Sequence, residues 1–489
     1  KIPTETGGGS PQPVRSPPEV SPLLQRMRLF PGFYELLGCG VSQVGLVVGN
    51  LSSGLDRGFV FDLVPTPRND AGEPASLFID TTRDNEKKGS KRRPQAEASS
   101  LVIDHDWVAE HGRQVSRMLL GGMKVIGLYV WASDNSFKNS TATLCQTVRG
   151  VAEAASFSSM TDSDQKLIIH ISYSPRRWTC RSCILTSNIS SSSLCPCDFK
   201  MGKVLKSLQT FKSVYNFDIR LPIYHEASTD LKTFADFLRR AISSLAKELS
   251  GAKAVIGGNL VLESEPCSSD DLHEVEFLLP FTGDMPAGVC SEREVVGVLA
   301  FSGSLCSFAY ANSREKISRA IFDIKEDIIK SLQTRLDILC DVDEEDMGPA
   351  SNDISTKNPT PQLVLRSLRK PCCLSFPRRV FVPWLVGTYI CDYIQSSESL
   401  EVVKEHCVEL LSMEAVADVS TVLQPEANAP AMAIGSFWDA AGSTKASTID
   451  RSERGSASMF ARLADFNLVF AVLILLASLV AAWLLVFIK

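Results

Sequence analysis

The sequence predicts a protein of mixed α/β and α+β class, made of an α/β domain and an α+β domain and followed by one C-terminal transmembrane helix. Three observations favour this fold class. Strand-type and helix-type hydrophobic patterns alternate through the first half, a long amphipathic helix lies in the second half, and residues 468–488 are apolar except for one serine. We expect a disordered segment over residues 1–40, an α/β domain over 41–250, a second α+β domain over 251–415, a flexible linker over 416–465 and a membrane anchor over 466–488.

The first domain is predicted from alternating strands and helices. Its clearest helix begins among Asp104 and Asp106 and ends at Gly121 and Gly122, because acidic residues favour a helix start and glycine favours its end. A turn is expected at residues 49–57. The other expected elements are strands at 43–48, 58–64, 124–131, 166–173 and 217–224 and a helix at 231–249.

The second domain is predicted to contain an antiparallel hairpin, with strands at residues 295–301 and 307–311 joined by a Ser-Gly-Ser turn at 302–304. Ser313 can then cap a long helix. The apolar face of that helix carries Ile317, Ile321, Ile324, Ile328, Leu332 and Leu339. Further strands are expected at 274–281, 380–384 and 387–393, and a helix at 400–411. Residues 416–458 are rich in Ala, Ser, Pro and Gly, which indicates a flexible tether.

The predicted anchor is the run from Leu468 to Ile488, which includes Leu475 and Trp483 and in which Ser478 is the one polar side chain. As a helix it would be roughly 31 Å long, close to the thickness of the hydrocarbon core of a bilayer. A core helix would keep a polar face, and this run has none. The charged residues beside it are Arg451, Arg454 and Arg462 before the run and Lys489 after it. This asymmetry predicts that the body faces the cytosol.

Net charge and cysteine content bear on the binding partners of the protein and on its compartment. The net charge of −6 gives no general electrostatic case for binding nucleic acid. The basic loop at residues 87–93 is interpreted as a solvated insertion, with contact to an acidic membrane surface or RNA as the alternative. Fourteen scattered cysteines are typical of a reducing compartment, so the sequons at Asn50, Asn139 and Asn188 are expected to stay unmodified.

One cysteine set could bind a metal. Cys180, Cys183, Cys195 and Cys197 follow the spacing C-x₂-C-x₁₁-C-x-C, and four thiolates at such spacing could hold zinc tetrahedrally. The second half is a poorer ligand pair than C-x-x-C, and Pro196 stiffens it, so ordinary reduced cysteines are the favoured interpretation. We therefore expect no metal site.

Catalytic motifs are not found in the sequence. The six histidines lie in no recognisable Cys or Ser motif, and His406 and Cys407 are neighbours on a helix whose side chains diverge. Neither a GxxxxGK[ST] loop nor a GxGxxG motif occurs. The sequence therefore predicts no enzymatic activity and no cofactor.

Three stretches resemble the odorant response abnormal protein 4 (Odr-4-like) family, and the resemblance covers roughly residues 41–489. The first stretch consists of Trp107, Ala109, Glu110, His111, Gln114, Val115, Ser116, Arg117, Met118, Leu119, Gly121 and Gly122, continuing into residues 125–129. The second is the turn at 302–304 with the helix after it. The third is the sequence RVFVP, which contains Phe381 and Pro383, followed by Cys391, Asp392 and Tyr393.

The resemblance implies a tail-anchored protein of the endoplasmic reticulum without enzymatic activity. Members of the family help membrane receptors mature and leave the reticulum, and they recruit the protease that processes the ubiquitin-fold modifier. The expected partners are therefore that protease, client membrane receptors and the membrane itself, but no nucleic acid.

The first half also resembles an MPN fold, whose active members carry an H-x-H zinc motif. Val130 and Ala132 stand at those positions here, which implies a catalytically dead MPN-like domain that pairs with a partner. A cluster of apolar residues near Trp131 is the expected contact surface. The alternative function is an active MPN isopeptidase or cysteine hydrolase, against which the missing motifs argue. A vesicle-fusion tether would need heptads before the anchor, and these are lacking.

Overall fold

The computed structural model describes thirteen stretches of the chain. They are residues 42–52, 57–80, 99–156, 165–173, 175–185, 194–198, 204–224, 234–261, 272–280, 295–346, 372–413, 419–426 and 428–436.

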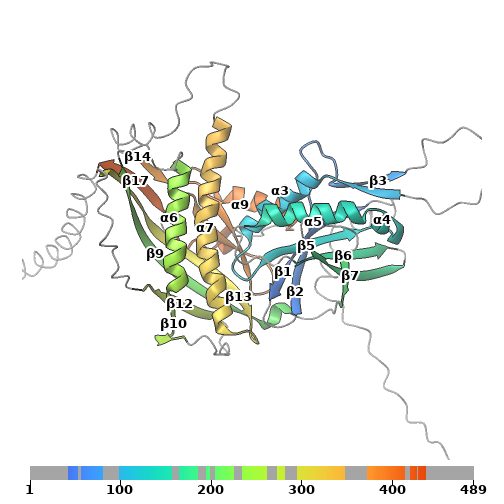
Figure 1. Ribbon diagram of the computed structural model, residues 1–489, viewed down its shortest axis with the longest axis horizontal. Helices are drawn as coiled ribbons and strands as arrows, with labels where there is room; N and C mark the ends of the chain where they lie inside the picture. Colours follow the sequence, from blue (N-terminus) through green and yellow to red (C-terminus); the bar gives the residue numbers. More distant parts are fainter. Residues whose placement is uncertain are drawn as a thin grey trace, which may run out of the picture.

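A six-stranded sheet with the order β2-β1-β5-β6-β7-β8 forms the centre of what we call the first unit. Its strands are β1 (Gln43–Ser52), β2 (Arg57–Pro65), β5 (Lys124–Trp131), β6 (Gln165–Tyr173), β7 (Arg176–Ile184) and β8 (Leu194–Cys197). All neighbouring pairs are antiparallel except β5 and β6, which are parallel. The helices beside this sheet are α3 (His105–Met118), α4 (Asp134–Asn139) and α5 (Thr141–Ala155), and a separate ribbon pairs β3 (Ser76–Asp80) with β4 (Ser99–Ile103) (Figure 1).

Both faces of the six-stranded sheet are buried. Leu46 and Leu128 belong to the core beneath the helices, whereas their neighbours Val47 and Tyr129 belong to a second apolar cluster on the opposite face. Successive side chains of a strand point to opposite faces, so a sheet covered on both sides requires nearly continuous apolar strands. This explains why polar and apolar residues do not alternate along the segment that forms β5.

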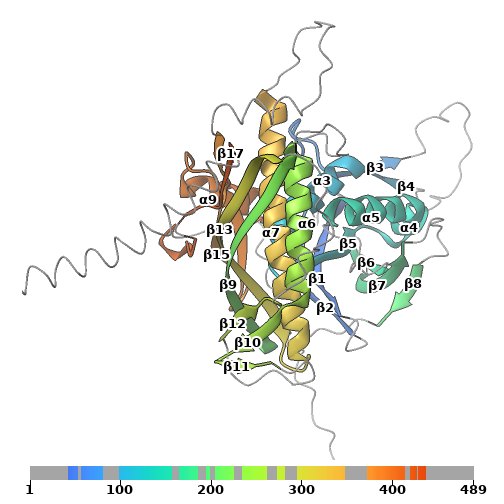
Figure 2. The same cartoon turned by 60° about the vertical axis from the view of Figure 1, so that its left-hand side comes forward.

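A seven-stranded sheet with the order β11-β10-β12-β9-β13-β17-β14 forms the second unit. Its strands are β9 (Leu208–Tyr224), β10 (Lys253–Ile256), β11 (Asn259–Leu260), β12 (Leu272–Leu278), β13 (Val295–Asn312), β14 (Cys372–Ser375) and β17 (Ala431–Ser436). Helices α6 (Phe234–Gly251) and α7 (Ile317–Asp346) lie side by side across one face of this sheet (Figures 1 and 2).

The predicted hairpin at residues 295–311 is wrong, because β13 is one continuous strand. It pairs with β9 throughout, and Gly303 lies opposite Phe217 in the middle of the ladder. Glycine is needed there for close packing, since a Cβ would lie 2.8 Å from the Cα of Pro430. The predicted cap is wrong as well: α7 begins at Ile317, and the amide of Ser313 instead donates a hydrogen bond to the carbonyl of Ser207 at 3.1 Å.

The predicted domain boundary at residue 250 does not separate the two units. Strand β9 and helix α6 precede it but belong to the second unit. Conversely, the hairpin β15 (Arg378–Pro383) and β16 (Tyr389–Ile394) and helix α9 (Leu400–Leu411) follow it and pack into the core of the first unit. The units are therefore interleaved along the chain.

Two shorter segments also differ from expectation. Strand β17 lies inside the predicted linker and pairs with β13 and β14, and two short 3₁₀ turns occur at Val204–Ser207 and Val419–Thr421. Strand β1 continues to Ser52, into the predicted turn.

Three predicted features lie outside the described residues. They are the N-terminal segment 1–40, the basic loop 87–93 and the membrane anchor 466–488, including Leu468, Leu475, Ser478, Trp483 and Ile488. Within the stretches that the structure describes, no helix has the length and apolar character needed to cross a membrane.

Candidate functional site

The end of the first motif stretch lies where the two units meet. The amide of Gly121 donates to the carbonyl of Phe308 at 3.0 Å, and the amide of Tyr310 donates to the carbonyl of Gly121 at 2.9 Å. These bonds form a parallel bridge between Gly121 and Ala309 of β13. We call this junction the seam; it joins the end of the motif helix α3 to the second unit.

Glycine is required at the seam for geometric reasons. Gly122 has a φ of +78°, and a Cβ on it would lie 2.2 Å from the carbonyl oxygen of Tyr310. A Cβ on Gly121 would lie 2.7 Å from the carbonyl oxygen of Asp323. Any side chain at either position would therefore push the two units apart.

His111 joins α3 to α9 through a partly buried hydrogen bond. Its Nε2 lies 2.8 Å from the carbonyl oxygen of Leu410, and its Nδ1 lies 3.2 Å from Oγ1 of Thr66. A carbonyl only accepts, so Nε2 carries the proton and Nδ1 accepts from the threonine hydroxyl. Burial lowers the pKa of His111 to about 4. The imidazole is thus a neutral structural link at physiological pH.

The third motif stretch meets the first across β16. The thiol of Cys391 donates to the carbonyl of Arg117 at 3.4 Å, which ties β16 to the end of α3. Asp392 accepts from His406 on α9 at 2.9 Å, and this bond raises the pKa of His406. Phe381 is fully buried and packs edge-on against Phe308 at 4.8 Å.

The remaining motif side chains also bond within the protein. The indole of Trp107 donates to the carbonyl of Pro67 at 3.0 Å, and the hydroxyl of Ser116 donates to the carbonyl of Ala155 at 3.1 Å. Glu110 accepts hydrogen bonds from Arg113 and Gln114, and the bond from Arg113 lowers the pKa of Glu110. Pro383 is exposed at the end of β15.

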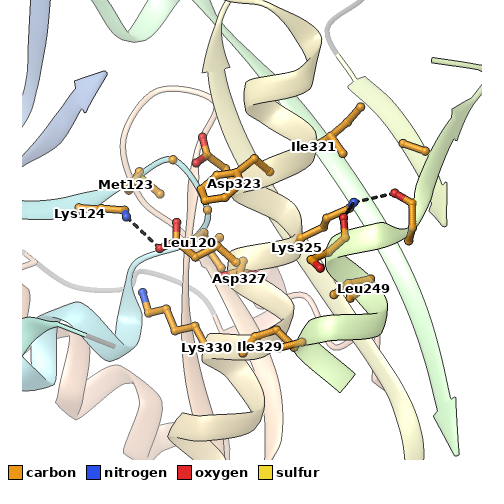
Figure 3. A pocket seen from close by; sticks show the side chains of 18 of the residues that line it. Leu120, Met123, Lys124, Leu249, Ile321, Asp323, Lys325, Asp327, Ile329 and Lys330 are labelled. Carbon is orange, nitrogen blue, oxygen red and sulfur yellow. Dashed lines mark hydrogen bonds and ion pairs between the residues drawn. The ribbon is translucent and has the colours of Figure 1, made fainter. Parts of the chain in front are cut away.

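A cavity of about 560 Å³ lies behind the seam, between α6, α7 and the Gly-Gly turn (Figure 3). Its apolar wall includes Leu120, Met123, Val125, Leu249, Ile321 and Ile329. Its charged groups are mostly bonded to the protein. Lys124 pairs with Glu326 at 3.0 Å, and Lys325 donates to the carbonyl of Ala252 at 2.7 Å.

Two groups in the cavity wall have strongly shifted pKa values. Burial raises the pKa of Asp323 to about 7, although Nη2 of Arg319 lies 3.0 Å from one carboxylate oxygen. Burial lowers the pKa of Lys330 to about 8, and its ammonium donates to the carbonyl of Leu119 at 2.8 Å. No histidine or cysteine is among the residues that line the described cavity. These side chains therefore form neither a Cys–His nor a Ser–His pair there.

Sequence reasoning missed a set of four buried charges that we call the ionic layer: Asp327, Arg335, Arg379 and Glu426. Arg379 binds Asp327 at 2.7 Å and Arg335 binds Glu426 at 2.8 Å. Both guanidinium groups are 0 % exposed. A signal was present, because Asp323, Asp327 and Lys330 recur at helical spacing on a second face of α7.

The cysteine set does not form a tetrahedral site. Cys180 lies opposite Cys197 on one face of the β7–β8 pair, whereas the thiol of Cys183 points to the other face and hydrogen-bonds Cys145 on α5. Among the described residues, no group of three or more His, Cys, Asp or Glu side chains is placed to hold a metal ion.

The positions compared with the H-x-H motif are apolar and buried. Val130 is 1 % exposed and Ala132 is 0 % exposed, and neither side chain can ligate a metal. Trp131, near which the partner contact is expected, is itself 3 % exposed and packs in the second apolar cluster of the first unit.

Comparison with known proteins places these features in a family. The curated Protein odr-4 homolog from Mus musculus is 24% identical over 364 residues, which covers 69% of this chain and 74% of the relative. The homologues from Homo sapiens and Dictyostelium discoideum are 25% and 24% identical and cover 68% and 73% of this chain and 74% and 73% of their own length.

Among solved structures, the crystal structure of UfSP from C. elegans aligns with a TM-score of 0.35 and 8% identity, covering 78% of this chain and 54% of that one. This likeness is too distant to support an inference. The family model described as Odorant response abnormal 4-like matches residues 45–422. Since this match spans most of the sequence, the chain belongs to the ODR4-like family.

Proposed function

We propose that this protein is a non-enzymatic adaptor of the endoplasmic reticulum. It holds the ubiquitin-fold-modifier protease at the membrane and assists the folding, maturation and trafficking of membrane receptors. Its body faces the cytosol, and residues 466–488 anchor it as a single transmembrane helix. Membership of the ODR4-like family, whose name refers to the odorant response, supports a role in receptor handling.

The main support for the proposal is that polar side chains of the family motif form hydrogen bonds within the protein. His111 bonds the carbonyl of Leu410, Ser116 bonds the carbonyl of Ala155, and Asp392 bonds His406. A catalytic motif would present such groups to a substrate. Here they bond α3 to α5 and α9, and β16 to α9, which suits a rigid body whose task is to hold a partner.

The MPN-like interpretation of the first half belongs to the same proposal. Valine and alanine at positions 130 and 132 leave no imidazole to bind zinc, so the first unit acts as a pseudoenzyme that pairs with the protease. Tethering raises the concentration of the protease near the membrane without any chemistry in the adaptor.

Protease localisation tests the adaptor role. In cells lacking this protein, the protease should lose its membrane association, and a chain without residues 466–489 should bind the protease one to one but leave it in the cytosol. A matched control, Ser478→Leu, keeps the apolar run and should retain the protease at the membrane. Unchanged membrane association in the knockout would contradict the adaptor role and leave receptor maturation as the function.

A glycosylation experiment tests the topology separately. An acceptor sequon appended after Lys489 should be glycosylated, while Asn50, Asn139 and Asn188 stay bare. Asn50 lies in β1 and is 5 % exposed, so a glycan on it would not fit the folded first unit. Sugar on any of the three native sequons would reverse the proposed orientation.

A further inference from the structure

The cysteines of the β7–β8 pair are arranged as two thiol pairs on opposite faces of the sheet. Cys180 and Cys197 are directly opposed in the antiparallel ladder. Directly opposed residues in such a ladder have Cα atoms about 4.5–5.5 Å apart, which is within the range that a disulfide spans. Cys183 forms the second pair, with Cys145.

The two pairs differ in access to solvent. Cys145 and Cys183 are 1 % and 0 % exposed between α5 and the sheet, so reagents in solution do not reach them. Cys180 is buried, but Cys197 is partly exposed on β8, the edge strand of the sheet. Cys195 is exposed and lies opposite Ser182, so it has no thiol across the ladder.

We propose that Cys180 and Cys197 are a thiol–disulfide exchange site whose co-substrate is a small disulfide of the glutathione type. The thiolate of Cys197 attacks one sulfur of the small disulfide, whose S–S bond breaks and releases one small thiol. The thiolate of Cys180 then attacks the sulfur of Cys197, which breaks the mixed disulfide and releases the second small thiol. Two protein thiols are oxidised and one small disulfide is reduced, so electrons and protons balance.

The order of the two steps follows from the surroundings of each sulfur. Burial and the neighbouring Cys197 raise the pKa of Cys180 to about 12, which makes it a poor first nucleophile. Cys197 is the more accessible thiol and reacts first. The resulting bond would fix the edge strand β8 to β7 and thereby control how available that sheet edge is to another chain.

Peptide mapping of the full-length protein in detergent tests this site. Reduced protein is incubated with mixtures of reduced and oxidised glutathione, alkylated and digested with trypsin. Trypsin cleaves after Arg177, Arg181 and Lys200, so Cys180 and Cys197 lie on different peptides, 178–181 and 182–200. We expect these peptides to become linked through Cys180 and Cys197, while Cys195 carries glutathione and the buried Cys145–Cys183 pair stays reduced.

Two variants distinguish a specific Cys180–Cys197 exchange site from nonspecific oxidation of cysteines. Cys180→Ser should abolish the linked peptide and leave glutathione on Cys197 as the stable product. Cys197→Ser, at a partly exposed position that folding tolerates better, should abolish the link and leave Cys180 unmodified. Linkage of Cys180 to Cys195 or Cys183, or no link under conditions that modify Cys195, would overturn the proposal.

Discussion

The two sheets of this protein differ in how far they are buried and in the kind of contact that buries them. The central strands of the six-stranded sheet are buried on both faces by apolar side chains, with Leu46 on one face and Val47 on the other at 0 % exposure. The second unit has an apolar core under α6 and α7, and the ionic layer lies where α7 meets β15. Arg335 and Arg379 of that layer are, of the described residues, the largest fully buried side chains.

The stability of each unit therefore depends on a different kind of contact. Apolar burial is non-directional and tolerates small shifts of one strand against another. A buried ion pair stabilises little compared with an apolar pair of the same volume, but removing one partner is costly because the other charge stays buried. Since Arg379 comes from β15 and Asp327 from α7, this pair specifies how the interleaved segments assemble.

Breaking the ionic layer should have the largest effect on stability. Arg379→Met leaves Asp327 buried without its partner, which should lower the free energy of unfolding by about 3–5 kcal/mol. Urea denaturation of the purified protein measures this loss. The double variant Asp327→Asn with Arg379→Met should recover most of it, and a double variant as unstable as the single one would contradict the charge argument.

A cavity opened in the first unit should lower the free energy of unfolding somewhat less than Arg379→Met does. Leu128→Ala removes a fully buried side chain from the helix-covered face of β5, and we expect a loss of about 3 kcal/mol in the same measurement. Leu77→Ala, at a position 50 % exposed, is the matched control and should change stability by less than about 0.5 kcal/mol. Equal losses at the two positions would show that burial does not determine the stability of this unit.

The seam can be tested with a pair of glycines of almost identical backbone conformation. Gly72 has a φ of +77°, and a Cβ added to it would meet no atom within 4 Å, whereas Gly122 has a φ of +78° and crowds Tyr310. Gly72→Ala should lower the free energy of unfolding by about 1 kcal/mol, because only the backbone conformation disfavours alanine there. Gly122→Ala should cost about 2–3 kcal/mol, because the units must also separate. Similar costs would mean that the seam adapts without strain.

The smallest expected effect is a pH-dependent change in stability that arises from Asp323. Asp323 has a folded pKa of about 7, above its usual value of 3.8, so its contribution to stability is present below pH 4 and is lost as the pH rises to 7. Relative to the native protein, Asp323→Asn should therefore gain about 1–2 kcal/mol of stability between pH 5 and pH 6. Thermal unfolding of both proteins at the two pH values checks this. A difference in stability that does not change with pH would show that the contact with Arg319 outweighs burial.

Local elements of the fold could be predicted from the sequence because their signals are local. Helix α9 has the predicted bounds, Leu400–Leu411, and α3 begins after Asp104, whose carboxylate accepts from the amide of Trp107 at 3.0 Å. The motif stretch ending at Gly121 and Gly122 correctly indicates the family, which the family match confirms. Its role at a seam was not visible, because the partner residue Ala309 lies far away in the sequence.

The family, the mixed α/β class and most helix and strand cores follow from the amino-acid sequence, since hydrophobic periodicity and helix caps act over a few residues. Three features follow from long-range pairing instead: β13 is one strand, β17 pairs with β13 although it lies in the predicted linker, and Cys180 faces Cys197 rather than Cys183. Strand pairing depends on partners tens to hundreds of residues away, and no local pattern encodes which partner is chosen.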